Sequence, residues 1–575
     1  GLPSAAHECT HAILRVLQSW FAEERLSDSL LVILTRGSVA VAGEDLFGGL
    51  SGTPVWGMAR SAQAEYPGRL VLADIDGARA SVDALAAALE SGESQLAIRD
   101  GQLFLPRLAR TAPEGPVASR APSSGAISQN GGSPAGRDLP GEVLDGDRLA
   151  LITGGTGGLG AIVARHLVAV HGARHLLLTS RRGRDAPGAR ELERELAGLG
   201  AHVRIEACDV SDYEQLRVLL DSIEDDHPLG AVVHVAGTGD NGLLEALTPE
   251  SVSEVFAPKL DAAWHLHELT EHLDLQAFVL YSSIAGLFGG PGQGNYAAAN
   301  AFLDGLAAFR RARGLNATSI VWGLWSEAGM GRGLSNVDVR RVLGSSSMRT
   351  IPTREGLELF DLALASGEGI VFPARLDGGA LRAEARAGTL PGLLRGLVRV
   401  PARATTERPD GFKQRLSSVP EDERAGIVLE LVRTEVASVL GHASPAAVEP
   451  AIAFRELGFD SLAAVELRNR LNDVCGLSLH ATVVFDYPTA GELAGHLLEL
   501  LTSGGLAGES GVDARIDELE LMLSTVAGDG GERERLAARL RTCLSALYGD
   551  GGNEDIDIAS DEELFELIDK GLGAR

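Results

Sequence analysis

In the stretch GQGNYAAAN (residues 292–300), Tyr296 is followed four positions later by Asn300. Two residues at this spacing lie on the same face of a helix. A free phenol has a pKa near ~10 and is a poor acid–base group at neutral pH. A nearby ammonium group would favour the phenolate and lower that pKa, but Asn300 carries no charge. Either Tyr296 transfers no proton, or a positive charge reaches it from elsewhere in the chain.

A glycine-rich segment, TGGTGGLG (153–160), connects a strand candidate that ends at residue 153 to a helix candidate over 161–170. Glycines allow the backbone to turn tightly and to approach a pyrophosphate, which the helix N-terminus then stabilises. In this strand–helix setting the segment indicates dinucleotide binding, and the alternative is a tight turn without a ligand.

The residues that end the second strand candidate discriminate between the two nicotinamide cofactors. An acidic side chain at this place would bind the ribose hydroxyls of NAD, whereas this chain has TSRRG (179–183). Ser180, Arg181 and Arg182 offer a hydroxyl and guanidinium groups that suit a 2′-phosphate. The pattern therefore favours NADPH, and the alternative is a solvated arginine pair in a loop.

The composition excludes several classes of protein. The 575 residues, 45% hydrophobic and 23% charged, are typical of a folded protein with several domains. The net charge of −28 disfavours nucleic acids and anionic membrane surfaces as partners and favours basic protein surfaces. The four cysteines are far apart without metal-ligand spacing, so we expect reduced thiols in a cytoplasmic protein and no metal site. We find no apolar run that would span a bilayer and no signal peptide.

Strand and helix candidates alternate through most of the chain. In residues 1–110 the strand candidates are 29–37 and 69–77, and residues 8–24 have the pattern of an amphipathic helix. From residue 148 onward, apolar strand candidates are separated by helix-like segments: 148–153, 175–180, 202–209, 230–237, 276–283, 317–323 and 369–376. Repeated strand–helix units predict an α/β fold with a doubly wound parallel sheet.

These patterns divide the chain into folded segments and linkers. The Pro/Gly/Ser-rich composition of residues 111–147 predicts a flexible linker, and a shorter polar linker is expected at 401–417. The folded segments that we expect are α/β over 1–110 and 148–400, a small four-helix domain over 418–503, and a helical tail over 504–575.

Ser283 lies thirteen residues before Tyr296, at the end of a strand candidate. Together with the glycine-rich segment, HVAG (234–237) and a helix that opens at NYAAAN, this spacing resembles the short-chain dehydrogenase/reductase family. The chain is more closely similar to the ketoreductase domains of modular type I polyketide synthases, in which an Asn stands four residues after the Tyr. The lysine of those domains lies upstream, in a segment like FAPKLDAAWHLHELT (256–270), so the resemblance assigns the missing positive charge to Lys259.

The resemblance implies a role for each member of this group. Tyr296 would give its proton to a carbonyl oxygen as hydride arrives at carbon, and Ser283 would hydrogen-bond the same oxygen. Lys259 would lower the pKa of the phenol and contact the nicotinamide ribose, while Asn300 would hold the lysine or a water. Taken singly, Lys259 is an ordinary surface charge and Ser283 an ordinary strand-end serine. The cofactor-binding residues that the resemblance implies are Thr153, Gly154, Thr156, Gly157, Gly158, Leu159, Ser180, Arg181, Asp209, Val210, Ala236 and Gly237.

Ketoreductases of this kind resemble a pair of related Rossmann-like halves, so residues 1–110 are expected to be a structural half that lacks its first strands. Family members that form the D-hydroxyl (B-type) have Pro and Asn just before the Tyr, as Pro291 and Asn295 do here, and a Leu-Asp-Asp loop. This chain has Gly-Asp-Asn at 239–241 in place of that loop, and Phe288 where the other class has Trp. The resemblance favours B-type.

The segment FRELGFDSLAAVELRNRL (454–471) resembles the prosthetic-group motif of acyl carrier proteins, and VVFDYPT (483–489) follows at the family's usual distance. Ser461 begins an amphipathic helix pattern, where the helix dipole would stabilise a phosphodiester. The resemblance implies that Ser461 carries a 4′-phosphopantetheine arm, and Asp460 and Glu466 add negative charge that a basic partner could recognise. The alternative is that Asp460 or Ser461 only caps the helix.

The tail carries further helix candidates. Residues 515–526 and 533–548 have narrow apolar stripes at heptad-like spacing, which favours dimerisation. A last helix candidate begins with a capping box from Ser560 to Glu563 and shows apolar residues among acidic ones. It resembles the C-terminal docking segments of polyketide synthase subunits, and the alternative is a solvated acidic tail.

The leading hypothesis is the ketoreductase, carrier and docking end of a longer modular polyketide synthase subunit, which reduces a β-ketoacyl thioester with NADPH. The expected partners are upstream ketosynthase and acyltransferase domains, a phosphopantetheinyl transferase, a downstream synthase subunit bound through the C-terminal helices, and a second copy of the chain. The alternative is a carrier and docking module whose reductase half is inactive or only epimerises the α-carbon. A free-standing reductase of small ketones would not explain Ser461 or the tail.

Overall fold

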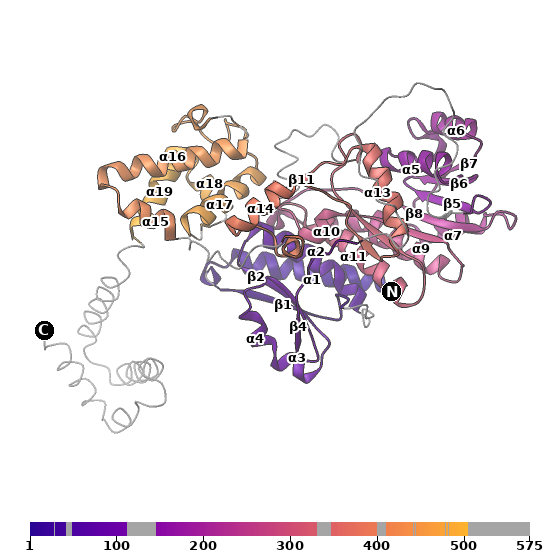
Figure 1. Cartoon of the computed structure of the whole chain (residues 1–575), viewed down its shortest axis with the longest axis horizontal. Helices are drawn as coiled ribbons and strands as arrows, with labels where there is room; N and C mark the ends of the chain where they lie inside the picture. Colours follow the sequence, from indigo (N-terminus) through magenta and orange to yellow (C-terminus); the bar gives the residue numbers. More distant parts are fainter. Residues whose placement is uncertain are drawn as a thin grey trace, which may run out of the picture. The chain divides into compact units, whose positions relative to one another are not determined.

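The structure, a computed structural model, describes residues 1–27, 29–41, 49–111, 145–329, 347–398, 410–440, 442, 444–477, 479–480 and 482–503 (Figure 1). Residues 1–493 form one compact unit and residues 494–575 a second. The expected linker at 111–147 lies almost entirely outside the described residues, and the expected dimerising and docking helices of 504–575 lie wholly outside them. Within the described ranges, no helix is long and apolar enough to cross a membrane.

The N-terminal half is built on a four-stranded sheet with the order β1-β2-β3-β4. The strands β1 (Leu31–Arg36), β2 (Leu70–Ile75) and β3 (Gln95–Arg99) are parallel, and β4 (Gln102–Phe104) pairs antiparallel with β3. All six residues of β2 are buried, as expected for a strand covered on both faces. The sequence patterns located β1 and β2 but missed β3 and β4, which are short and begin or end in polar residues.

The second half is built on a seven-stranded parallel sheet with the order β12-β10-β9-β8-β5-β6-β7. Its strands are β5 (Leu149–Thr153), β6 (His175–Ser180), β7 (His202–Ala207), β8 (Leu229–His234), β9 (Ala277–Ser283), β10 (Thr318–Trp322) and β12 (Ile370–Val371). The strand order reverses between β5 and β8, and ligands of such sheets bind outside the carboxyl ends of the strands at that point. The predicted parallel-sheet, Rossmann-like architecture is confirmed.

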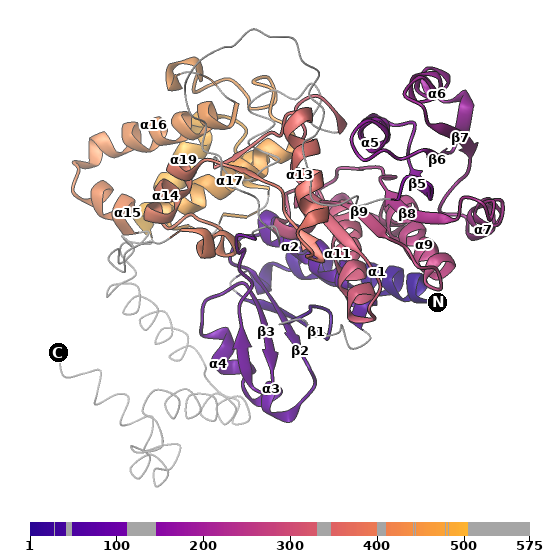
Figure 2. The same cartoon turned by 45° about the vertical axis from the view of Figure 1, so that its right-hand side comes forward.

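Helices cover both faces of this sheet (Figure 2). They are α5 (Gly158–Ala169), α6 (Ala189–Gly198), α7 (Tyr213–Asp221), α8 (Pro249–Phe256), α9 (Ala262–Thr270), α10 (Ile284–Phe288), α11 (Gly294–Ala312) and α13 (Thr353–Ala365). Because strand side chains alternate between faces, Leu151 of β5 joins a core with α7, α8, α9 and α11, whereas Ile152 joins a core with α5, α6 and α13.

The core that contains Leu151 continues into the N-terminal half. It includes buried residues of α1 (Leu2–Ala22) and α2 (Thr53–Glu65), so the two halves share one apolar interior. Helix α2 packs directly on α11, because a Cβ atom on Gly57 would lie 2.2 Å from the carbonyl oxygen of Ala297. Any side chain at position 57 would therefore force α2 away from α11.

Polar side chains of α2 also hold backbone segments that precede α8 and α11. Arg60 Nη1 donates to the Gly286 carbonyl oxygen at 2.6 Å, and Ser61 Oγ donates to the Gly290 carbonyl oxygen at 2.5 Å. The two carboxylate oxygens of Glu65 accept from the N–H groups of Leu244 and Gly292, each at 2.9 Å. The N-terminal half thus fixes the loop that leads into the helix of Tyr296.

Two details of the sequence prediction are wrong. The strand expected at 369–376 is two short strands, β12 and β13 (Arg375–Leu376), and β13 pairs antiparallel with β11 (Met348–Arg349) outside the main sheet. Pro373 lies between them, and a proline has no N–H to continue a sheet ladder. In addition, the helix α15 (Asp410–Ser417) occupies the second part of the segment expected as a linker.

The segment expected to be a carrier contains four helices: α16 (Glu421–Leu440), α17 (Ser461–Cys475), α18 (Val483–Asp486) and α19 (Ala490–Ser503). Helices α16 and α17 pack against each other. The boundary between the two compact units falls within α19.

Glu65 provides a test of the contact between the two halves. Burial raises the pKa of this carboxyl to about 7, against the lowering effect of its two backbone hydrogen bonds. A group whose pKa is raised by folding contributes stability that is complete below the unfolded pKa, near 4.5, and is lost as pH rises through about 7. Replacing Glu65 by Gln removes this titration and leaves one buried N–H without its acceptor, which costs about 1–3 kcal/mol.

We therefore expect Glu65→Gln to destabilise the protein most at pH 5 and least at pH 8. Thermal unfolding of the two proteins across that range measures the difference. A penalty that grows with pH would contradict this account of the interface.

Candidate active site

Several of the expected catalytic and cofactor-binding residues lie at or just beyond the carboxyl ends of neighbouring strands. Thr153 ends β5, Ser180 ends β6, Asp209 and Val210 follow β7, Ala236 and Gly237 follow β8, and Ser283 ends β9. This is the edge of a Rossmann-like sheet at which ligands bind. The structure therefore brings together side chains that are up to 130 positions apart in the sequence.

The glycine-rich loop is compact enough to admit a phosphate close to its backbone. Gly154 has a φ of +65°, and a Cβ atom there would lie 3.0 Å from the backbone of Ala236. Gly157 caps α5, which starts at Gly158, so Thr156 and Leu159 flank the helix N-terminus. Gly160, the last residue of the glycine-rich segment, is not among the expected cofactor-binding residues, but the fold of the loop also requires it. A Cβ on Gly160 would lie 2.3 Å from the Gly154 oxygen, so only glycine fits there.

The residues at the end of β6 fit a phosphate group. The hydroxyl oxygen of Ser180 is buried and has no hydrogen-bond partner among the described residues, which is a costly state unless a ligand supplies a partner. Arg181 and Arg182 beside it are exposed. In the described chain, neither guanidinium group forms an ion pair.

Lys259 is buried close to Tyr296. It lies on a π-helical turn, η5 (Ala257–Asp261), between α8 and α9, and it is 4% exposed. Its Nζ atom donates hydrogen bonds to Asn300 Oδ1 at 2.9 Å and to the Tyr281 carbonyl oxygen at 3.0 Å. The same Nζ atom lies 5.3 Å from the centre of the Tyr296 ring. A lysine from another helix thus lies near the Tyr296 ring.

Asn300 connects the lysine to the helix of the tyrosine. Its Oδ1 atom accepts from Lys259, and its Nδ2 atom donates to the Tyr296 carbonyl oxygen at 2.7 Å. The side chain is fully buried, so both of its bonding atoms are used inside the protein. An uncharged amide at this position can accept a hydrogen bond from an ammonium group, which a lysine could not do.

Gly237 makes room for the lysine. A Cβ atom at this position would lie 2.7 Å from Lys259 Cε and 3.4 Å from Nζ. The glycine of HVAG is therefore required by the path of the Lys259 side chain as well as by its place at the sheet edge.

His234, the first residue of HVAG, is a positioning residue that the sequence pattern alone does not indicate. Its Nε2 atom lies 3.3 Å from the Lys259 carbonyl oxygen, which can only accept, so Nε2 carries the proton. Nδ1 then accepts from the Thr153 hydroxyl at 2.8 Å. Burial, with a further contribution from Lys259, lowers the pKa of His234 to about 3. This neutral imidazole links the strand before the glycine loop to the lysine turn.

Asp304 was also missed, and it supports the charge on Lys259. Burial lowers the pKa of Lys259 to about 8, and the negative charge of Asp304 opposes that fall. Burial likewise raises the pKa of Asp304 to about 6, against a hydrogen bond from Ser319 Oγ at 2.6 Å. Asp304 lies one helical turn beyond Asn300, which is a spacing that the sequence shows but that carries no recognised motif.

One expectation about Tyr296 is wrong. We expected the ammonium to lower the pKa of the phenol. In the structure, burial raises the pKa of Tyr296, and hydrogen bonding with Ser283 and Asn300 opposes the rise. Tyr296 and Ser283 are 7% and 8% exposed, so the loss of water outweighs these hydrogen bonds. The phenol is therefore protonated at neutral pH, which is the form that can give a proton.

In the carrier-like segment, Ser461 is exposed and is the first residue of α17. The cap of this helix is Asp460, whose side chain accepts from the Ala463 N–H at 2.7 Å. The Ser461 hydroxyl is therefore not needed as a cap. Glu466 pairs with Arg470 at 3.0 Å, so its negative charge is partly neutralised, unlike the expected acidic face.

Comparison with known families gives three matches. Residues 1–108 match the Rossmann fold domain of polyketide synthase extender module SpnB, residues 149–327 match the KR domain, and residues 430–497 match the phosphopantetheine attachment site. The last two matches imply NADPH and 4′-phosphopantetheine as cofactors.

Related proteins and structures agree with these matches. Polyketide synthase GfsA of Streptomyces halstedii is 45% identical over 98% of this chain, and pikromycin polyketide synthase component PikAII of Streptomyces venezuelae is 48% identical over 75% of it. The chain spans only 7% and 12% of the length of these two proteins. A structure of A-type ketoreductases from a modular polyketide synthase is 38% identical, with a TM-score of 0.54 over 64% of this chain and 73% of that one. A C2-type ketoreductase is 31% identical, with a TM-score of 0.56 over 68% of this chain and 79% of that one.

Replacing Gly237 by Ala tests the position of the lysine. The added methyl group displaces the Lys259 ammonium from Asn300, and a misplacement of about 1 Å can reduce catalysis about 10²-fold. We expect a loss of that order in the rate of ketone reduction by NADPH, with little change in melting temperature.

The control is Gly323→Ala at the end of β10, where the added Cβ would meet Ile351 at an ordinary 3.8 Å. Full activity in the Gly237 variant would mean that the path of Lys259 does not matter.

The pKa of Lys259, about 8, predicts that activity falls as pH rises through that value, because the ammonium loses its proton. Asp304→Asn removes the charge that raises this pKa, so the alkaline fall should begin at lower pH. A pH profile of kcat/KM measures the shift, and an unmoved or upward-shifted alkaline limb would disprove the link between these two residues.

Proposed function

Since the chain belongs to the ketoreductases of modular type I polyketide synthases, enzymes of the short-chain dehydrogenase/reductase type, we propose that it reduces a β-ketoacyl thioester with NADPH. The observation that carries the proposal is the hydrogen bond between Lys259 Nζ and Asn300 Oδ1, buried beside the Tyr296 ring. It gives the phenol the cation that its own helix does not supply.

The proposed reaction assigns one task to each side chain. The cofactor supplies a hydride to the carbonyl carbon when bound. Tyr296 gives its proton to the carbonyl oxygen as negative charge develops there, and Ser283 donates a hydrogen bond to the same oxygen. Lys259 then stabilises the phenolate that remains on Tyr296, while Asn300 keeps the ammonium in place.

The proposed cofactor site extends from the glycine-rich loop to the end of β6. The loop backbone and the N-terminus of α5 would hold the pyrophosphate. The unpaired hydroxyl of Ser180 and the exposed guanidinium of Arg181 would hold the 2′-phosphate, which supports NADPH as the hydride donor. Asp209, Val210 and Ala236 would line the remainder of the site.

We propose a B-type outcome, the D-hydroxyl. Asn295 is buried, and its Oδ1 atom accepts from the Tyr296 N–H at 2.8 Å, so it orients the first turn of α11. Pro291 and Phe288 also follow the B-type pattern, whereas residues 239–241 depart from it. Similarity to A-type and C2-type structures reflects the shared fold and does not discriminate between the outcomes.

We further propose that Ser461 carries the phosphopantetheine arm that delivers the substrate. Its exposure at the start of α17, with Asp460 as the cap, supports this assignment. In the proposed synthase, upstream ketosynthase and acyltransferase domains supply the β-ketoacyl chain, and a downstream subunit receives the product. A phosphopantetheinyl transferase would load Ser461, and the chain would act as a homodimer.

The second candidate is a carrier module whose reductase half is inactive or only epimerises the α-carbon. The complete group of Ser283, Tyr296, Lys259 and Asn300 argues against it, because each side chain is buried within one site.

The test is oxidation of NADPH in the presence of a β-ketoacyl pantetheine thioester, followed by chiral chromatography of the alcohol. We expect turnover by the native chain and a loss of about 10²–10⁴-fold for Tyr296→Phe, which removes the proton donor. The control is Tyr213→Phe, at an exposed tyrosine of α7. Absence of NADPH oxidation with several such thioesters would favour the carrier module, and an L-alcohol would overturn the B-type assignment.

A further inference from the structure

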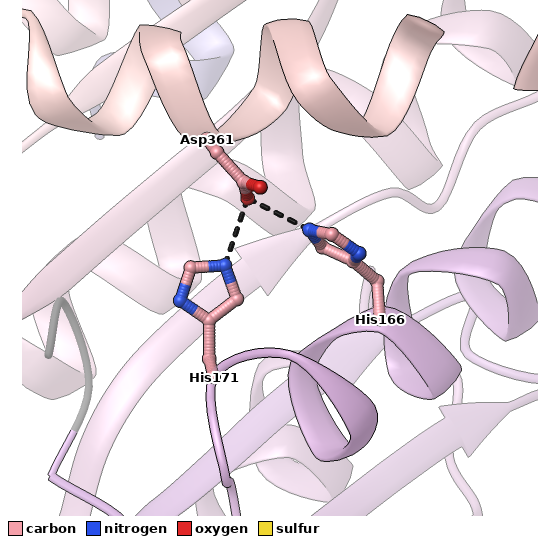
Figure 3. A group of neighbouring side chains, drawn as sticks. All are labelled: His166, His171 and Asp361. Atoms are coloured by element: carbon pink, nitrogen blue, oxygen red, sulfur yellow. Dashed lines mark hydrogen bonds and ion pairs between the residues drawn. The ribbon is translucent and has the colours of Figure 1, made fainter. Parts of the chain in front are cut away.

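Two histidines and an aspartate form a cluster that the reductase chemistry does not use. His166 lies in the last turn of α5, His171 follows the end of that helix, and Asp361 projects from α13 toward both imidazole rings (Figure 3). The glycine-rich loop is at the other end of α5, so the cluster lies one helix length from the cofactor loop.

The three side chains direct their ligating atoms toward one point. His166 Nε2 lies 2.7 Å and His171 Nε2 2.8 Å from the same oxygen, Asp361 Oδ1. One ligand atom from each residue lies within 4.8 Å of the other two. Two imidazole nitrogens and one carboxylate oxygen are the donor set of many sites for zinc and neighbouring divalent metals.

We propose that His166, His171 and Asp361 bind one divalent transition-metal ion, with Zn²⁺ as the best match to their chemistry. Bonds of about 2.0–2.1 Å in a tetrahedral arrangement require the ligand atoms to be about 3.3 Å apart. The observed separations are hydrogen-bond distances, so each nitrogen needs to move away from the carboxylate by about half an ångström. The protons on the two Nε2 atoms leave or shift to Nδ1 as the ion binds.

The local charge distribution suits a cation. Asp361 contributes a carboxylate oxygen that lies within hydrogen-bond distance of both imidazole rings. The C-terminal end of α5 adds partial negative charge from its last carbonyl groups.

The cluster is buried but accessible from solvent. The two histidine side chains are 8% exposed and the Asp361 side chain is 23% exposed. An ion can therefore enter from the Asp361 side, and a water molecule can complete the fourth position, as it does in zinc sites with three protein ligands.

A bound ion would join α13 to the C-terminal end of α5. Because α5 begins at the cofactor loop, the ion would stabilise the half of the protein that carries the active site. This role is structural and does not depend on the proposed reductase chemistry. The alternative is a hydrogen-bonded triad that never binds a metal.

The experiment uses the full chain after treatment with a chelator and titrates it with Zn²⁺ and with Co²⁺. We expect one Zn²⁺ per chain, a rise in melting temperature of about 2 °C or more, and the visible absorption of four-coordinate Co²⁺ without a thiolate charge-transfer band. His171→Gln and Asp361→Asn should each weaken binding about 100-fold or more and leave the metal-free fold unchanged by circular dichroism.

The control is His202→Gln. It removes a histidine from a separate group of stacked rings, formed by His175, His202 and His227. This variant should bind zinc as the native chain does. The proposal is overturned if the native chain binds no zinc at micromolar concentrations, if the His171 and Asp361 variants bind it equally well, or if the Co²⁺ spectrum shows sulfur ligation. If either variant fails to fold, the stoichiometry and the Co²⁺ spectrum of the native chain still decide the question.

Discussion

The active site depends on a single buried ammonium group that is held by an uncharged amide. Transfer of Lys259 from water to the protein interior is unfavourable, and its pKa falls to about 8 for that reason. The charge survives because Asn300 and the Tyr281 carbonyl accept hydrogen bonds from the ammonium and because Asp304 is nearby. Much of the surrounding structure serves this one placement: the wide π-helical turn that carries the lysine, the glycine at position 237 that leaves room for its side chain, and the neutral His234 that bonds the same turn.

The sequence predicted the parts of this site that follow from local pattern. The glycine loop at the end of β5, the arginines after β6 and the spacing from Ser283 to Tyr296 each depend on a short stretch, and each lies where the sheet requires it. Lys259 could be chosen only by resemblance, because a lone lysine on a helix is ordinarily a surface charge. Asp304 and His234 were missed because their roles come from burial and from contacts across helices. The direction of the Tyr296 pKa was wrong for the same reason, since the extent of desolvation is a property of the folded chain.

The fold shows the same division between local and non-local information. Apolar runs identified most strands of the large sheet, whereas Pro373 split the last of them into β12 and β13. The dependence of the catalytic half on α2 was not visible in the sequence. It arises from a glycine that lets two helices touch and from three polar side chains that bond to backbone 179 to 229 positions away. The candidate metal cluster is a further case, because Asp361 and His166 are 195 positions apart and match no ligand spacing.

The most direct test of the central claim is a double-mutant cycle between Lys259→Met and Tyr296→Phe, measured as kcat/KM for reduction of a β-ketoacyl thioester. If the ammonium acts through the phenol, removing the second group after the first should cost little, and the double variant should be about as slow as the slower single variant. Losses that multiply would show that the two groups act independently, and they would contradict the claim that Lys259 serves Tyr296.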